Sequence, residues 1–352
     1  MRAASACWIS ARGIFHTKYP GDDFARCSTF LRALAGTMGA MTFASHSGRG
    51  VALVALASIL WGTTGTAQSL GAGALSPFWV GAAQLAVASL FFALVQAVAR
   101  GAAAPQPAAT PRPHVPPGLW LLASAGVAGY SITFYAGVRL TGVGVGTAVA
   151  IGSSPIWAGL IQALLLRAAP SPLWWLGTAV SVAGGVAMVL SKGAAVALSW
   201  TGLALCLAAG LWYASYALVN KRLVAAYAPG QVNQRVFTGA ALLACPLAWA
   251  LAGAPQWSPA ALAVVVYLGI VVSGLAYVAF SHGLRSISGA TGVTLTLIEP
   301  VAAFVLAVLI VGEQQPLVAW CGLGLVMLGL MGVIRAELRP TAFRAPRESA
   351  AA

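Results

Sequence analysis

The run TLIEPVAAFVL, residues 296–306, indicates the fold class, because it sets a carboxylate and a proline, Glu299 and Pro300, inside an apolar segment. That segment extends from residue 287 to residue 311 and holds no other charged side chain. A helix needs about 20 residues to cross the roughly 30 Å of hydrocarbon in a bilayer. The segment therefore predicts a membrane-spanning helix with one acid buried in it.

The composition of the whole chain also indicates a membrane protein. Of its 352 residues, 60% are hydrophobic and only 7% are charged, whereas about a quarter of the residues of a soluble domain are charged. Ten apolar runs are long enough to span a bilayer, and they lack the period-two alternation of a membrane β-barrel. We predict an all-α membrane protein with ten transmembrane helices. The runs are residues 51–70, 76–98, 118–138, 142–166, 172–190, 198–219, 236–252, 259–281, 287–311 and 316–335.

The net charge of +13 does not indicate nucleic-acid binding, because the basic residues are scattered over the leader, the ends of the apolar runs, a loop and the tail and form no patch with interleaved aromatics. If the N-terminus is cytoplasmic, only Arg139 and Lys192 of the 19 Lys and Arg residues lie on the opposite side. This asymmetry follows the positive-inside rule. We expect a multi-pass protein of the cell membrane, plasma or inner, with both termini in the cytoplasm and no nucleic-acid partner.

The two halves of the apolar region resemble each other. YAGVRL (135–140) aligns with SHGLRS (281–286). Further matches in the same order pair Trp61 with Trp212, Pro155 with Pro300, Gly177 with Gly322 and Gly184 with Gly329. Each half holds an odd number of predicted spans, so the second half enters the membrane upside down. Inverted repeats of this kind are typical of secondary transporters, which bind substrate near the midplane where the halves meet.

The repeat divides the chain into four regions. We predict a first five-helix repeat at residues 51–190 and a second, inverted one at residues 198–335. The polar segment at residues 1–46 is predicted to be a disordered leader, and residues 336–352 a basic cytoplasmic tail.

These features resemble the EamA-type transporters of the drug/metabolite transporter superfamily. The resemblance rests on five-plus-five spans, a Trp in the first span of each half, a proline within spans four and nine, and EPVAAFVLAVLIVGE (299–313). It covers roughly residues 50–335 and implies a pseudo-symmetric bundle that exports small metabolites or drugs. The sequence departs from the family pattern at two places: LLLRAAP (164–170) replaces a terminal Gly-Glu, and Gln84 stands where the family often carries Arg.

Glu299 is the acidic residue set deepest in a predicted span, 12 residues from its start and so on the order of 18 Å into the membrane. An ionised carboxylate at that depth costs about 2.5–3.5 kcal/mol, so it should face the bundle interior or a wet cavity. Burial favours its neutral form, so it is suited to exchanging protons or to binding a substrate amine. The alternative is structural: Pro300 has no N–H for the carbonyl of Thr296, and Glu299 satisfies polar groups at the resulting kink.

Other polar and aromatic residues inside the spans complete the predicted substrate site. Hydroxyls on one helix face can line a cavity or hold helices together, and aromatic rings can stack on a cationic substrate or simply pack. The predicted substrate-binding or coupling residues are Glu299, Ser154, Thr147, Trp61, Trp212, Tyr213, Tyr216 and Gln84, with Pro155 and Pro300 as structural hinges.

The sequence thus favours a secondary transporter that exports amino acids, amines or related compounds by alternating access, with proton coupling. Its expected partners are a small-molecule substrate, the lipid bilayer and protons, and the oligomeric state stays open. A channel or a non-transporting receptor or scaffold is the alternative. A membrane enzyme is disfavoured, because the four histidines are scattered and no second acid accompanies Glu299. We expect no metal and no cofactor, since no metal-ligand spacing or nucleotide-binding loop is present.

Overall fold

The computed structural model describes residues 46–64, 67, 75–101, 115–141, 143–190, 199–306, 308–309 and 315–338. The elements in these residues are helices, with no strand. Residues from Arg49 onward form one compact unit, and the description below concerns that unit. The predicted leader up to residue 45, the end of the first predicted span and the tail beyond Leu338 lie outside the described residues.

The helices follow the predicted runs closely. The first half contains α3 (His46–Gly62), α5 (Pro77–Gly101), α6 (Pro117–Thr141), α7 (Val143–Leu164) and α8 (Pro172–Leu190). The second half contains α9 (Trp200–Ala226), α10 (Pro229–Ala252), α11 (Pro259–Tyr267), the π-helix η1 (Leu268–Leu275), α12 (Ala276–Gly283), α13 (Gly289–Leu295), α14 (Ile298–Leu306) and α15 (Leu317–Leu338).

Eight helical segments are long and apolar enough to cross a membrane, and Ser47–Gly62 and Pro172–Met188 are two shorter apolar helices. The all-helical class is confirmed. Eight candidate spans are found among the described residues, so the number ten stays a prediction.

Two boundaries were wrong by seven residues each, because polar residues in a helix lower its hydropathy. Helix α9 continues beyond residue 219 to Ala226, and α10 begins at Pro229 instead of residue 236. The polar residues there have partners: the Asn220 Nδ2 atom donates to Ser281 Oγ at 3.1 Å, and Asn233 Nδ2 donates to the Tyr277 carbonyl at 3.0 Å. These internal hydrogen bonds allow polar side chains to extend the helices inside the bundle.

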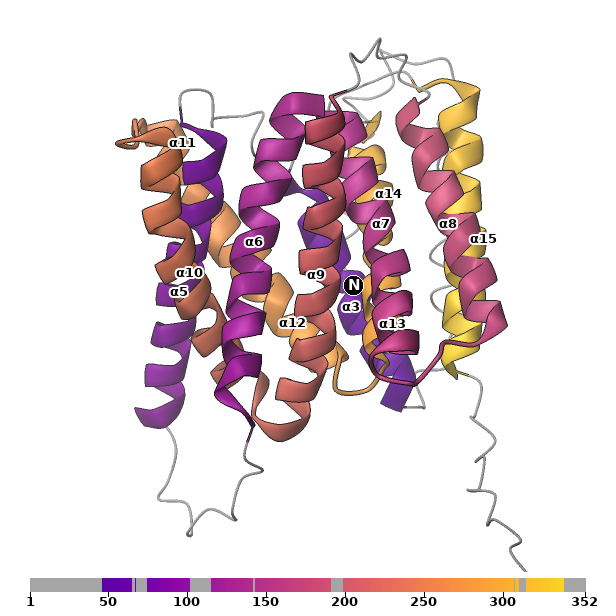
Figure 1. Cartoon of the computed structure of the whole chain (residues 1–352), viewed down its shortest axis with the longest axis horizontal. Helices are drawn as coiled ribbons and strands as arrows, with labels where there is room; N and C mark the ends of the chain where they lie inside the picture. The colour runs from indigo at the N-terminus through magenta and orange to yellow at the C-terminus, as the bar shows by residue number, and fades with distance from the viewer. Residues whose placement is uncertain are drawn as a thin grey trace, which may run out of the picture. The chain divides into compact units, whose positions relative to one another are not determined.

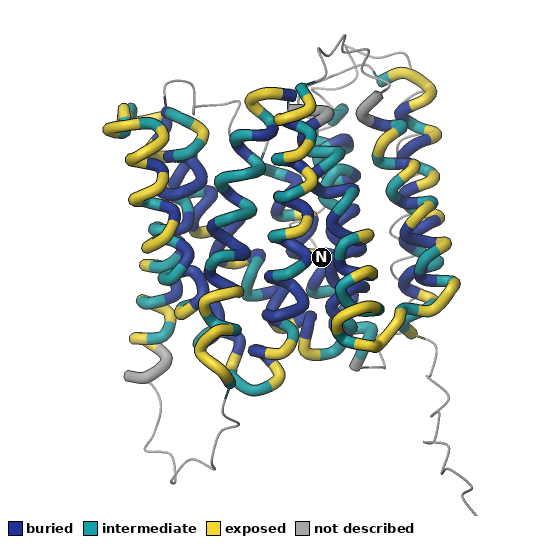
Figure 2. Tube along the Cα trace, viewed as in Figure 1, coloured by how far each residue is buried: buried dark blue, intermediate teal, exposed yellow. Residues whose placement is uncertain are grey.

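The outer faces of the helices are apolar. Figure 2 shows exposed residues along the outward sides of the helices and buried residues within the bundle. Leu90 and Leu242 are 70% and 71% exposed. Exposed apolar patches of this extent are rare on soluble monomers, and a lipid environment accounts for them, because hydrocarbon is the solvent that these side chains face in a membrane.

Glycines bring helices α8 and α15 into close contact, side by side at one end of the bundle (Figure 1). A Cβ atom added at Gly177 would lie 2.6 Å from the Gly329 carbonyl oxygen, and one added at Gly184 would lie 2.5 Å from that of Gly322. Because the lower number on α8 meets the higher number on α15, the two helices run antiparallel. The four glycines are the ones that the sequence repeat aligns in pairs.

The variant Gly184→Ala tests this packing. Its methyl group would meet backbone atoms of α15, so we expect the protein to lose about 1–3 kcal/mol of stability. Gly185→Ala is the matched control, because a Cβ atom at Gly185 meets nothing within 4 Å. Melting of the purified protein in detergent measures both. Equal melting temperatures for the two variants would contradict the close contact.

Candidate functional site

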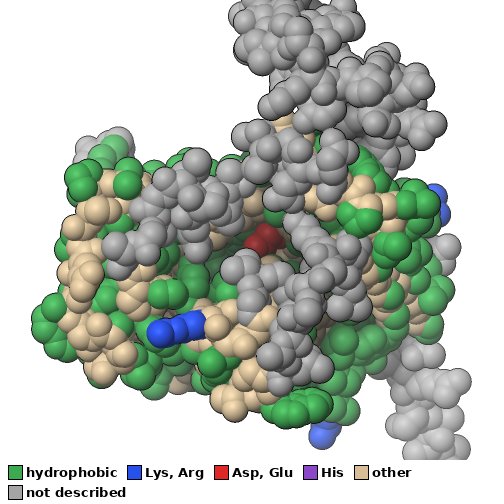
Figure 3. All heavy atoms as spheres, turned by 90° about the horizontal axis from the view of Figure 1, so that it is seen from above, with side chains coloured by type: hydrophobic (Ala, Val, Ile, Leu, Met, Phe, Trp, Pro, Cys, Tyr) green, Lys and Arg blue, Asp and Glu red, His purple; other side chains and the backbone are tan. Residues whose placement is uncertain are grey.

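A cavity of about 90 Å³ lies between helices of both halves, large enough for several water molecules. Figure 3 shows a hollow in the face viewed from above, with side-chain atoms of an acidic residue (red) at its base. The lining residues come from α3, α5, α6, α7, α9, η1, α12 and α14 and from two turns. They are Trp61, Thr64, Gln84, Tyr130, Ser131, Phe134, Tyr135, Ala150, Ile151, Ser154, Tyr213, Val272, Ser273, Tyr277, Thr296 and Glu299.

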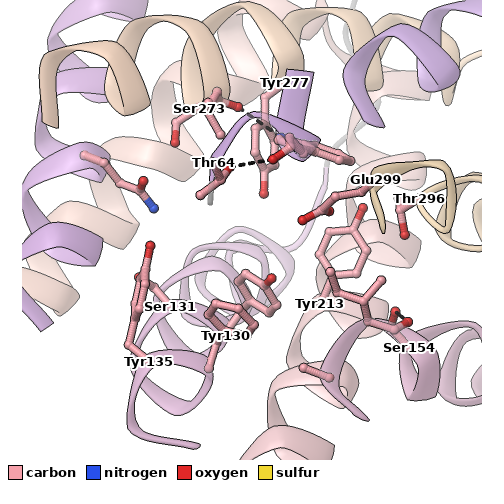
Figure 4. A pocket seen from close by; sticks show the side chains of 16 residues that line it. Thr64, Tyr130, Ser131, Tyr135, Ser154, Tyr213, Ser273, Tyr277, Thr296 and Glu299 are labelled. Carbon is pink, nitrogen blue, oxygen red and sulfur yellow. Dashed lines mark hydrogen bonds between the residues drawn. The ribbon is translucent and has the colours of Figure 1, made fainter. Parts of the chain in front are cut away.

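Glu299 is the only charged residue among the described residues that line this cavity. Figure 4 shows its carboxyl group pointing into the open space, near Tyr213. Three tyrosines from three different helices, Tyr130, Tyr213 and Tyr277, line the same cavity as Glu299. The carboxylate is thus surrounded by tyrosines and has no ion-pair partner among the described lining residues.

A break in the ninth span positions this carboxylate. Helix α13 ends at Leu295 and α14 begins at Ile298. Pro300 cannot donate to the Thr296 carbonyl, and the Glu299 N–H donates to that oxygen instead at 2.8 Å, one residue earlier than in a regular helix. This shift takes the Glu299 N–H away from Leu295, and the Ser58 hydroxyl of α3 lies 3.2 Å from the Leu295 carbonyl oxygen.

The break also places Glu299 in the first turn of α14. The N-terminal end of a helix is positive and stabilises a nearby carboxylate. Burial in a cavity of low polarity has the opposite effect, because it disfavours the charged form. The carboxyl group is therefore held between two opposing electrostatic influences.

The equivalent proline of the first half, Pro155, is accommodated differently. Helix α7 continues through Pro155 without a break. Pro155 has no N–H for the Ile151 carbonyl four residues back, and the Ser154 hydroxyl donates to that carbonyl at 2.7 Å. Ser154 is buried and lines the cavity, so its hydroxyl hydrogen serves the backbone while its oxygen borders the open space.

The eighth span contains a third irregularity beside the cavity, the π-helix η1. Such π-segments within α-helices occur frequently at functional sites. The indole Nε1 of Trp61 donates to the Val272 carbonyl of η1 at 3.0 Å. This hydrogen bond fixes the Trp61 ring against the second half, next to Ser273 and Tyr277, which also line the cavity.

Aromatic rings form much of the cavity wall. The ring centroids of Trp61 and Tyr277 lie 5.1 Å apart, those of Tyr130 and Tyr213 5.7 Å, and those of Tyr130 and Phe134 5.3 Å. Rings at these separations stabilise one another. The wall is therefore built of mutually packed rings, with π-faces and phenol groups next to a single carboxylate.

Three polar atoms of lining residues are buried without a hydrogen-bond partner in the described part of the chain: Gln84 Oε1, Ser131 Oγ and the Tyr213 hydroxyl. A buried polar atom without a partner costs about 1–3 kcal/mol. Such atoms at one cavity indicate that water or a ligand satisfies them there.

The structure brings together five of the eight predicted binding or coupling residues. Glu299, Ser154, Trp61, Tyr213 and Gln84 line the cavity.

The other three, Thr147, Trp212 and Tyr216, are not among the described lining residues. The Trp212 ring instead packs against Gly129, so closely that a Cβ atom added at Gly129 would lie 2.7 Å from the ring. Tyr216 is fully buried beside Phe280. Thr147 lies on α7, two helical turns before Ser154.

Sequence reasoning missed the contribution of α6. Tyr130, Ser131, Phe134 and Tyr135 all line the cavity. Their spacing offered a signal, because residues four apart lie on one helix face, and Tyr130 and Phe134 stand in a span made mostly of Ala, Gly and Leu.

Comparison with known proteins assigns the chain to a family. The EamA-like transporter family matches twice, at residues 48–190 and 200–335. The chain belongs to this family. The "Uncharacterized transporter YwfM" of Bacillus subtilis is 32% identical over 281 residues, which cover 79% of this chain and 91% of that protein. The "Probable terminal-alkyne amino-acid exporter" of Streptantibioticus cattleyicolor is 25% identical over 285 residues, which cover 80% of this chain and 92% of that protein.

A solved protein structure with 20% sequence identity has the same fold, with a TM-score of 0.68 over 81% of this chain and 97% of that chain. The EamA-like transporter is therefore a multi-span membrane protein from a family of transporters. Membership of this family indicates a small-molecule substrate and a lipid environment, and it indicates transport and not catalysis.

Two adjacent serines provide a test of the hinge at Pro155. Ser154→Ala leaves the Ile151 carbonyl without a donor, so we expect a loss of about 1–3 kcal/mol of stability. Ser153→Ala is the control: its hydroxyl contacts the Ala150 carbonyl, which keeps a regular helical N–H partner. Denaturation in detergent measures both variants. A Ser154→Ala protein as stable as Ser153→Ala would refute this role of Ser154.

Proposed function

We propose that this EamA-like transporter is a secondary transporter of the cell membrane that exports small metabolites or drugs, among them amino acids, amines or related compounds, in exchange for protons. The observation that carries the proposal is the cavity between the two matched segments, with Glu299 as its charged group. We infer that the transporter works by alternating access of this cavity to the two sides of the membrane.

Two sets of contacts support an inverted relation between the halves. The repeat makes Gly177 equivalent to Gly322 and Gly184 equivalent to Gly329. The contact of Gly177 with Gly329 and the contact of Gly184 with Gly322 are therefore equivalent, so the antiparallel contact of α8 with α15 is the same when the halves are exchanged. In addition, a Cβ atom on Gly137 of α6 would lie 2.6 Å from Cys206 of α9, the first helix of the second half. Correspondingly, one on Gly283 of α12 would lie 2.7 Å from Val54 of α3, the first helix of the first half.

The hydrogen bonds at the opposite end from the hollow support an outward-facing state with a closed cytoplasmic side. Lys221 Nζ donates to the Leu284 carbonyl at 2.6 Å, which ties the end of α9 to the end of α12. Glu337, near the end of α15, accepts from the Ser288 N–H at 2.7 Å and from Thr291 Oγ1 at 2.6 Å. These ends carry most of the basic residues of the helices, which is why we assign them, and both chain termini, to the cytoplasm.

Charge explains why such a site would couple transport to protons. A buried carboxylate without a partner is unfavourable, whereas a neutralised one is much less so. The halves can therefore move around Glu299 most easily when it holds either a proton or a positively charged group. An exporter that returns with a proton after releasing its substrate meets this requirement.

Glu299→Gln tests the proton-coupled mechanism. Because a side-chain amide does not bind a proton near neutral pH, we expect pH-driven substrate movement to fall at least about tenfold. The measurement is uptake of radiolabelled amino acids and amines into proteoliposomes with an imposed pH gradient. Glu348→Gln is the control, since this acid lies in the predicted cytoplasmic tail, outside the predicted spans; it should keep its pH response.

Unchanged pH dependence in Glu299→Gln would remove Glu299 from the mechanism. Absence of flux for every compound would favour a receptor or scaffold, and conductance far above carrier turnover would favour a channel. Melting curves of the purified variants separate loss of coupling from loss of folding.

A further inference from the structure

The described residues that line the cavity include no basic residue to balance Glu299. Lys, Arg and His are absent from residues 51–99, 115–138, 140–166, 168–191, 193–220, 236–281 and 286–334. These ranges include segments that the structure does not describe, so the statement holds for the sequence itself. A substrate in the cavity therefore meets a negative charge and no positive one.

This imbalance distinguishes two classes of substrate. A cation without a carboxylate neutralises Glu299 and leaves the cavity with no net charge. A zwitterionic amino acid brings a second carboxylate, and no Lys, Arg or His in these ranges can pair with it. Hydroxyls such as those of Ser131 and Tyr213 can donate to an anion, but two carboxylates in one small cavity repel each other, and a buried charge without an ionic partner is unfavourable.

The cavity wall suits a cation. Trp61, Tyr130, Tyr213 and Tyr277 present aromatic rings, whose faces attract ammonium groups. The unpartnered Gln84 Oε1 is an acceptor and cannot donate. An ammonium group can thus find a carboxylate, an amide oxygen and π-faces in the same cavity.

The volume limits the size of this cation. At about 90 Å³, the space enclosed by the described residues is well below the roughly 300–1,000 Å³ of pockets for drug-sized ligands. A small amine fits this limit better than a large multi-ring drug.

We propose that the substrate is a small organic cation without a carboxylate, such as a primary monoamine, and that it competes with a proton for Glu299. One monovalent cation then leaves for each proton that enters, so the exchange moves no net charge. This inference rests on the proposed function, because it names the substrate class of the same cavity.

The groups around Glu299 identify it as the origin of this competition. Besides Glu299, the titratable side chains among the described lining residues are Tyr130 and Tyr135 of α6, Tyr213 of α9 and Tyr277 of α12. The described lining residues of α3, α5, α7 and η1 are not titratable. Phenols ionise near pH 10 in water, so Glu299 is the group among these described lining residues at which a proton can compete with a cation.

Calorimetric titration of the full-length protein in detergent tests the substrate class. The probes are two pairs that differ by a carboxylate, phenethylamine with phenylalanine and isoamylamine with leucine, together with the bulky cation tetraphenylphosphonium. We expect each amine to bind at least about 100-fold more tightly than its amino acid, and tetraphenylphosphonium to bind more weakly than either amine.

Acidification from pH 8 to pH 6 should weaken binding of the amines by up to about tenfold per pH unit, because one proton competes with one cation. Glu299→Gln should lose both the tight binding and this pH dependence, whereas Glu348→Gln, the same change in the predicted cytoplasmic tail, should keep them. Amino acids that bind as tightly as the matched amines, or amines that do not bind, would overturn the proposal.

Flux measurements separate this inference from the proposed function. Tetramethylammonium, a permanent cation that does not cross lipid unaided, should enter proteoliposomes under a pH gradient at a rate that a valinomycin potassium clamp leaves unchanged. Leucine flux that depends on Glu299, without cation flux, would overturn the cation class and leave the proton-coupled transporter standing. Absence of pH-driven flux for every probe would overturn both.

Discussion

A protein in hydrocarbon has no water to satisfy its backbone, so every peptide group in a span needs a partner within the protein. Pro155 and Pro300 each withhold one N–H from this requirement. The Ser154 hydroxyl supplies the missing donor in α7, and in the ninth span the Glu299 N–H shifts by one residue while Ser58 of α3 lies against the Leu295 carbonyl. These replacements keep irregular backbone tolerable in the middle of the membrane.

The same replacements build the cavity. The break between α13 and α14 places Glu299 in the first turn of α14. In the π-helix η1, the Val272 carbonyl accepts a hydrogen bond from the Trp61 indole. Each irregular segment borders the open space, and residues of each are among its lining. Backbone irregularity, the placement of the carboxylate and the shape of the cavity are therefore consequences of one requirement for hydrogen bonds.

Much of this arrangement is visible in the sequence. Length and hydropathy locate the helices, because crossing hydrocarbon demands long apolar runs, and a lone acid in such a run marks an interior position. Hydropathy does not distinguish α-helical from π-helical hydrogen bonding, so η1 was not foreseen. The last two turns of α9, which begin at Asn220, contain polar residues and are too polar for hydropathy to assign them to a span. The repeat aligns Trp61 with Trp212, but neighbours decide their roles: Trp61 meets Val272, and Trp212 packs on Gly129.

The two prolines also make the halves unequal. If the halves exchange roles during transport as proposed, identical halves would give the outward-facing and inward-facing arrangements the same energy. Here one half answers its proline with a serine side chain and the other with a broken helix and an acid. The empty carrier then has a preferred resting orientation, and the difference between Ser154 and Glu299 is one contribution to that preference.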